Sequence, residues 1–175
     1  MGTENHQSFY LIQHIPKTAG TTLRHIVDQQ FGPKNVLTYY NQPSIQLLEN
    51  IEAHLTIFPN YQAIIGHFKF GVHQKLSSAS TYITFLRHPV ARTISQYKEW
   101  TVNSPERLCG EDGKIQTLAE SVDKNPDYYR DYQTSFLIGE ATADMPAASI
   151  SDIALQNLAD YYDGIGLVEY FDQSM

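Results

Sequence analysis

The sequence predicts an α/β fold of three layers, in which helices flank a mainly parallel central sheet. Short apolar runs alternate along the 175 residues with longer segments of helical periodicity. Two of these apolar runs stop abruptly at polar turns that lead directly into a helix. Such alternation is typical of parallel sheets, which bind their ligands where the strands end.

The apolar runs are rich in Ile, Val, Tyr, Phe and Thr, the residues that favour strands. They predict strands at Ser8–His14, Asn35–Tyr39, Tyr61–Gly66, Thr81–Leu86 and Gly164–Val168. Helices are expected between them, at Thr21–Gln30, Ser44–Thr56, Val90–Thr101, Ile115–Asp123, Tyr128–Leu137 and Asp152–Tyr161.

Two boundaries follow from local residue chemistry. Ser151 and Asp152 precede an apolar periodic run, which is a helix N-cap signal. The polar stretch Asn103–Lys114 predicts an exposed loop. At this length the chain is expected to form a single domain, residues 1–175, with a sizeable core.

The first strand leads into the most informative segment of the chain. It ends near Pro16, and Lys17, Thr18, Ala19 and Gly20 form a tight loop before a helix begins. A loop at a helix N-terminus binds phosphate or sulfate, because free N–H groups and the positive helix dipole converge there. Gly20 permits close approach, Lys17 supplies a charge, and two hydroxyl donors follow at Thr21 and Thr22.

This loop is P-loop-like but departs from the P-loop of nucleotide triphosphatases. In that motif the lysine follows the last glycine, and a Ser or Thr holds magnesium. Here Lys17 precedes Gly20 by three residues, and the strand Thr81–Leu86 ends in Arg87 rather than in a metal-binding aspartate. The sequence therefore indicates an anionic nucleotide that is handled without a metal.

At these residues the chain resembles the sulfotransferases that use 3′-phosphoadenosine 5′-phosphosulfate (PAPS), and most closely a bacterial-type member of the carbohydrate branch with the heparan and uronyl 2-O-sulfotransferases. The segments that resemble this branch are HIPKTAGTTL (His14–Leu23), IIGHFKFGVH (Ile64–His73), FLRHPVARTISQY (Phe85–Tyr97), DYQTSFLIG (Asp131–Gly139) and GIGLVEYFDQSM (Gly164–Met175).

The resemblance implies a role for each segment. Pro16–Thr22 would bind the 5′-phosphosulfate, Arg87 and Ser95 would hold the 3′-phosphate, and His67 would be the general base with Lys17 as the second catalytic residue. His14 and His88 are the candidates to assist His67. The implied reaction transfers a sulfuryl group from PAPS to a hydroxyl of a carbohydrate or other small acceptor and releases adenosine 3′,5′-bisphosphate (PAP).

The chain departs from the resembled pattern at two places. Ser135 stands where the family block carries an arginine after Gln-Thr, so one basic contact is expected to be absent. The relatives also continue into a further helix and loop, so the chain is expected to be shortened after Met175. These departures keep open a non-catalytic PAP-binding module, and a kinase-like enzyme of related fold is the other alternative.

Composition bears on location and partners. No apolar run approaches the roughly 18 residues of a membrane span, and the only cysteine is Cys109, so a cytoplasmic protein without membrane contact is expected. The net charge of −7 argues against nucleic acid as a partner. Homo-oligomerisation is left open, and the identity of the acceptor is not encoded in any motif.

Charge is divided unevenly along the chain. Residues 1–98 hold eight Lys/Arg against four Asp/Glu, and residues 99–175 hold four against fifteen. The basic half contains both nucleotide motifs, which favours a local positive field over an anionic ligand. The seven histidines lack the spacing of a metal site, so no metal is expected.

Overall fold

The computed structural model describes residues 9–40, 44–110, 112–139 and 146–175. Its centre is a five-stranded sheet in the order β2-β3-β1-β4-β5, in which every pair of neighbouring strands is parallel. The predicted parallel sheet is therefore confirmed. The strands are β1 (Phe9–Gln13), β2 (Val36–Tyr39), β3 (Ala63–Gly66), β4 (Ser80–Leu86) and β5 (Tyr162–Leu167).

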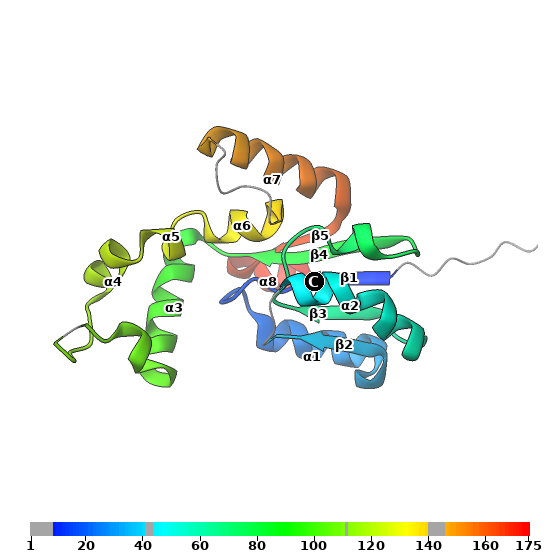
Figure 1. Cartoon of the computed structure of the whole chain (residues 1–175), viewed down its shortest axis with the longest axis horizontal. Coiled ribbons are helices and arrows are strands. Elements are labelled where there is room, and N and C mark those ends of the chain that lie inside the picture. The colour runs from blue at the N-terminus through cyan, green and yellow to red at the C-terminus, as the bar shows by residue number, and fades with distance from the viewer. Residues whose placement is uncertain (1–8, 41–43, 111, 140–145) are drawn as a thin grey trace, which may run out of the picture.

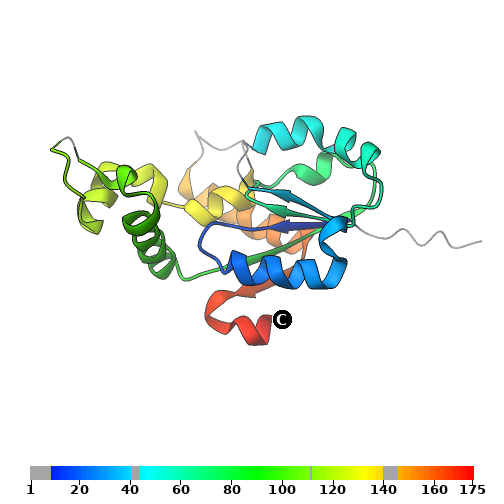
Figure 2. The same cartoon turned by 90° about the horizontal axis from the view of Figure 1, so that it is seen from below.

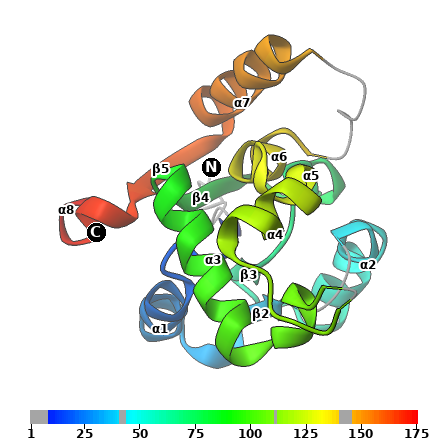
Figure 3. The same cartoon turned by 90° about the vertical axis from the view of Figure 1, so that its left-hand side faces the viewer.

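Helices cover both faces of this sheet (Figures 1 and 3), which confirms the three predicted layers. One face carries α1 and α8, and the other carries α2, α6 and α7. The helices are α1 (Gly20–Phe31), α2 (Ser44–Ile57), α3 (Pro89–Asn103), α4 (Leu118–Lys124), α5 (Pro126–Tyr129), α6 (Tyr132–Ile138), α7 (Ala147–Tyr161) and α8 (Phe171–Ser174), with short 3-10 turns η1 (Pro33–Asn35), η2 (Val72–Lys75), η3 (Pro105–Leu108) and η4 (Val168–Tyr170).

The core is split by the sheet into two apolar clusters. Because successive side chains of a strand point to opposite faces, Leu11 and Ile64 pack in one cluster while Ile12 and Ile65 pack in the other. All four residues of β3 are buried. Strands covered on both faces read as continuous apolar runs, which is why the sequence locates them so well.

Helix α3 leaves the sheet beyond the carboxyl ends of the strands (Figures 1 and 2). Its Arg92 is only 1% exposed, and the guanidinium carbon lies 4.0 Å from the centroid of the Tyr132 ring on α6. This cation–π contact links α3 to α6.

Three predicted helices differ clearly from the structure. The helix expected at 115–123 begins only at Leu118, after Thr117, which caps it together with Glu120. The helix expected at 128–137 is two helices, because the chain leaves helical geometry at Arg130 and Asp131 takes a left-handed backbone with φ of 50°. The helix expected at 152–161 is α7, and it begins at Ala147 rather than at Asp152. Pro146, whose ring fixes φ near the helical value, directly precedes it, so the N-cap signal at Ser151 lies inside the helix.

The stretch predicted as an exposed loop contains a short turn with a buried anchor. Residues 105–108 form η3, and the Leu108 side chain is fully buried although most of its neighbours are exposed. A single apolar residue in a polar segment carries no periodicity, so the sequence could not signal this anchor. Within the described ranges, no helix combines the length and apolarity needed to cross a bilayer.

A buried amide at the end of β1 joins the sheet to the helical layer that contains α6. Gln13 is fully buried, and its Nε2 donates to the carbonyl oxygens of Phe68 and Phe136, both at 3.0 Å. Its Oε1 accepts the hydroxyl of Tyr162 on β5 at 2.8 Å. All hydrogen-bonding atoms of this side chain are thus used, which makes a buried polar group compatible with the core.

Gln13→Leu is expected to lower the free energy of unfolding by about 2–4 kcal/mol, because it removes the donor to the carbonyl oxygens of Phe68 and Phe136 and the acceptor of the Tyr162 hydroxyl. Of these groups, the Phe136 oxygen keeps the N–H of Phe70 as a partner. Urea unfolding followed by circular dichroism measures the loss. Tyr162→Phe is the matched control and should cost only about 1 kcal/mol. Equal, small losses for the two variants would show that the amide does not hold the layers together.

Candidate functional site

The predicted site lies where three adjacent strands end. Lys17 follows β1, His67 follows β3 and Arg87 follows β4, and the sheet order places β1 between the other two. A cavity of about 550 Å³ opens between these loops and α3. It is lined by His14, Pro16, Lys17, Ala19, Gly20, Thr21, Thr22, His67, Arg87, Ser95, Gln96 and Glu99.

The loop after β1 has an unusual backbone. Lys17 and Ala19 both take left-handed conformations, with φ of 72° and 64°. Non-glycine residues adopt this region at an energetic cost that surrounding structure must offset, and such residues concentrate at functional sites. Between them Thr18 is fully buried, and both its N–H and its hydroxyl donate to the carbonyl oxygen of Ile15.

Thr18 is the one predicted ligand residue that does not line the cavity. Its two donors close the turn of the loop, so it shapes the site instead of facing it. Gly20, Thr21 and Thr22 form the first turn of α1. Their backbone N–H groups therefore have no hydrogen-bond partner within the helix. No acidic residue lies in this turn, so the positive end of the helix dipole faces the cavity uncompensated.

Arg87 is held in place through its backbone. Its N–H donates to Oε1 of Gln133 at 2.9 Å, and Nε2 of Gln133 donates to its carbonyl oxygen at 2.7 Å. The Arg87 side chain donates from Nη1 to the carbonyl oxygen of Lys17 at 3.3 Å, and its buried Nε has no partner among the described residues. The guanidinium therefore retains donors for an anion in the cavity.

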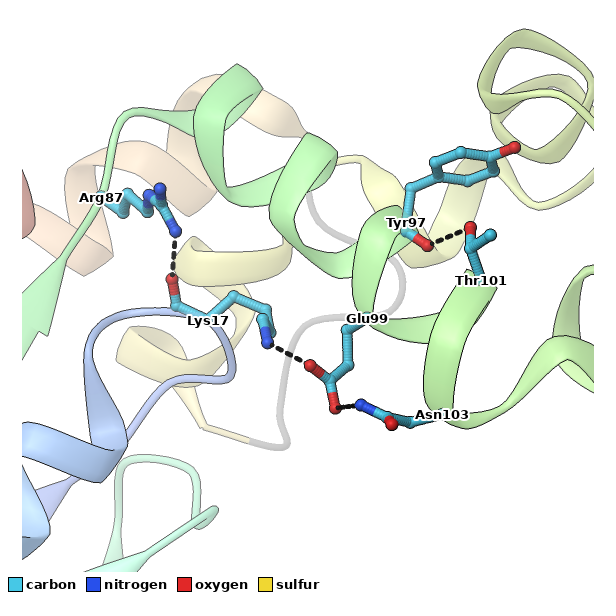
Figure 4. A network of polar contacts seen from close by, with 6 residues as sticks. All are labelled: Lys17, Arg87, Tyr97, Glu99, Thr101 and Asn103. Carbon is cyan, nitrogen blue, oxygen red and sulfur yellow. Dashed lines mark hydrogen bonds and ion pairs between the residues drawn. The ribbon is translucent and has the colours of Figure 1, made fainter.

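Lys17 already has a carboxylate partner in the structure (Figure 4). Its Nζ lies 2.9 Å from Oε2 of Glu99 on α3, and Asn103 donates to the other oxygen of Glu99 at 2.8 Å. The hydrogen bond from Lys17, followed by that from Asn103, lowers the pKa of Glu99. The lysine charge is thus neutralised by a residue that is only one helical turn from Ser95.

His14 and His67 line the opposite wall of the cavity, and the Tyr40 ring packs against both. The His67 ring centroid lies 4.8 Å from those of both His14 and Tyr40. Burial lowers the pKa of His67, although a hydrogen bond to the backbone of Tyr40 acts in the opposite direction. Burial, then the neighbouring His67 and Lys17, lowers the pKa of His14 to about 3. Both imidazoles are neutral near pH 7, and a neutral imidazole can accept a proton.

A comparison with known protein families identifies the family of this chain. A model of the sulfotransferase family matches residues 4–169. The chain belongs to the sulfotransferase family. The family supports a transferase that moves sulfuryl groups from a sulfate donor to an acceptor. A search among curated proteins found no match.

The remaining histidine candidate of this sulfotransferase lies outside the cavity. His88 is exposed, and its N–H donates to Oε1 of Glu169 at 3.0 Å. Of the two assistants considered for His67, only His14 lines the cavity. In the part of the chain that the structure describes, no three His, Cys, Asp or Glu side chains are grouped so as to hold a metal ion.

Sequence reasoning gave no site role to three residues that shape this site, Gln96, Glu99 and Gln133. Glu99 could have been found from its spacing, because it follows Ser95 by four residues and so shares its helix face. Gln133 lies in the resembled block Asp131–Gly139, but that resemblance assigned it no role. Ser135, which replaces an arginine of the resembled block, donates to the carbonyl oxygen of Tyr132 within α6.

Glu99→Gln is expected to tighten sulfate binding severalfold, because the anion no longer competes with a carboxylate for Lys17. Titration with sodium sulfate at constant ionic strength, followed through the amide resonances of residues 20–22, measures the change. Asp152→Asn on α7 removes the same charge elsewhere and should have no such effect. Unchanged or weaker sulfate binding in Glu99→Gln would show that the carboxylate supports the site.

Proposed function

We propose that the chain transfers a sulfuryl group from PAPS to a hydroxyl of a carbohydrate or other small acceptor, with His67 as general base. The observation that carries this proposal is the convergence of Lys17, Arg87 and the N-terminus of α1 on one cavity whose other wall holds His67. Cationic donors for two anionic groups and a neutral base are the parts that this reaction needs.

The donor would occupy the cationic wall. The N–H groups of the first turn of α1 and the Lys17 ammonium would bind the 5′-phosphosulfate. Arg87 and Ser95 would hold the 3′-phosphate, and the unpartnered Nε of Arg87 supports this assignment. A bound anion at Lys17 would take the place of the Glu99 carboxylate.

The chemistry would combine positioning with charge stabilisation. The acceptor oxygen attacks sulfur as its proton passes to His67, the bond from sulfur to the bridging oxygen breaks, and PAP leaves with the bonding electrons. Lys17 and the loop N–H groups would stabilise negative charge on the sulfuryl oxygens and on the leaving phosphate. The lowered pKa of His67 keeps the imidazole neutral and ready to accept the proton.

Calorimetric titration tests the donor assignment. PAP should bind with unchanged affinity in excess EDTA, because Lys17 and Arg87 supply the positive charge that magnesium supplies in kinases. ATP with magnesium is the comparison ligand. Binding of ATP–magnesium that disappears on chelation, together with no measurable affinity for PAP, would overturn the proposal in favour of a kinase-like enzyme.

Arg87→Ala is expected to weaken PAP binding by about 2–3 kcal/mol, the range for losing charge-assisted hydrogen bonds. Adenosine 5′-phosphosulfate lacks the 3′-phosphate, so its affinity should barely change. The pair of ligands distinguishes local recognition from damage to the loop, which Arg87 also contacts at the Lys17 carbonyl. Equal losses for both ligands would assign Arg87 a structural role.

His67→Ala should lower turnover by roughly a hundredfold or more, the scale for losing a general base, and leave PAP affinity nearly intact. In the unaltered chain the rate should rise with pH and level off with a midpoint below the ordinary histidine pKa of 6.5, because burial lowers the pKa of His67. A screen of hydroxylated acceptors with radiolabelled PAPS measures turnover. Normal turnover in the variant would remove His67 from the mechanism, and binding of PAP with no turnover would indicate a non-catalytic module.

A further inference from the structure

The His14 ring occupies a space that a side chain would otherwise fill. Gly20 is the first residue of α1, and a Cβ atom added to it would lie 1.7 Å from Cε1 of His14 and 1.9 Å from Nε2. All of its nearest neighbours belong to this one imidazole. The backbone of Gly20 is helical, a conformation that alanine adopts readily. The glycine is therefore required here by the ring and not by backbone geometry.

On its other side the same ring packs against His67. The two ring centroids are 4.8 Å apart with planes at 49°, and Tyr40 lies edge-on to both rings. The backbone fixes this contact, because the His14 N–H donates to the carbonyl oxygen of Gly66 at 2.9 Å. His14, His67 and Tyr40 thus follow the adjacent strands β1, β3 and β2.

The His14 ring makes these contacts without hydrogen bonds. Both ring nitrogens are buried, and neither has a partner among the described residues. A buried polar atom without a partner costs free energy, so the imidazole is held there by its shape and its neighbours. The charged groups near the three rings are Lys17 beside His14 and, from α1, Arg24 and Asp28 beside Tyr40.

We propose that His14 is a positioning residue, a spacer between Gly20 and His67 that fixes the base relative to the loop that binds the sulfate donor. This inference rests on the proposed function, in which His67 accepts the proton of the acceptor. A displacement of about 1 Å between reacting groups can cost a hundredfold in rate, so a rigid spacer at this point has a direct effect on catalysis.

The first test follows the His67 ring by NMR titration of the protein alone. His14→Ala should raise the pKa of His67 toward its ordinary value, because water then reaches the ring. His14→Phe should keep the pKa low, since a phenyl ring fills the same space. His25→Ala, an exposed histidine on α1, is the control. An unmoved pKa in His14→Ala, or an equal rise in His14→Phe, would overturn the spacer role.

The second test uses PAP affinity in a double-variant cycle. Gly20→Ala should weaken PAP binding on the order of tenfold, because its methyl group forces the His14 ring and the loop apart. In the His14→Ala background the same change should cost nothing further. Equal losses in both backgrounds would show that Gly20 serves the bound anion directly, and the spacer role would fail.

The two tests separate this inference from the proposed function. The NMR titration needs no ligand, so it reports on the His14 spacer even in a protein that binds no PAP. Absence of PAP binding in the unaltered chain would contradict the proposed function but not the spacer role of His14. Normal PAP binding, together with a His67 titration that does not depend on residue 14, would contradict the spacer role of His14 but not the proposed function.

Discussion

The site depends on the position of β1 between β3 and β4. Neighbouring strands of a sheet lie about 4.8 Å apart, so the residues that follow three adjacent parallel strands meet at one edge. Lys17, His67 and Arg87 come from positions that span 71 residues of sequence, yet parallel pairing alone brings them to a common cavity. A slip in the register of β1 would shift the loop that carries Lys17 relative to His67 and Arg87, which follow the neighbouring strands.

The parts of the site that come directly from strand ends could be predicted from the sequence. Buried strands appear as continuous apolar runs, and the residue after each run is then a candidate ligand, as with Arg87. Residues supplied by a helix beyond the strand ends, such as α3, could not be placed in this way. Glu99 reaches Lys17 because α3 projects over the strand ends, where Arg92 of the same helix packs against Tyr132 of α6.

The same distinction explains the errors in helix boundaries. The residues at Ser151 are compatible with a helix start, but they do not require one. Pro146 allows an earlier start, so α7 begins before Ser151. The break at Asp131 separates two short helices that both contact α3, since Arg92 lies over the Tyr132 ring of α6 and Trp100 contacts Tyr128 of α5. Such contacts between elements are not contained in single-sequence periodicity.

The ion pair between Lys17 and Glu99 has a consequence for which solutes reach the loop. With the lysine neutralised, an anion must displace a carboxylate that is also held by Asn103, and a monovalent ion such as chloride has little Coulombic advantage in that exchange. A ligand with several negative charges that also contacts Arg87 has a large Coulombic advantage in displacing the carboxylate. The ion pair thus favours multivalent anions over monovalent ones at this loop.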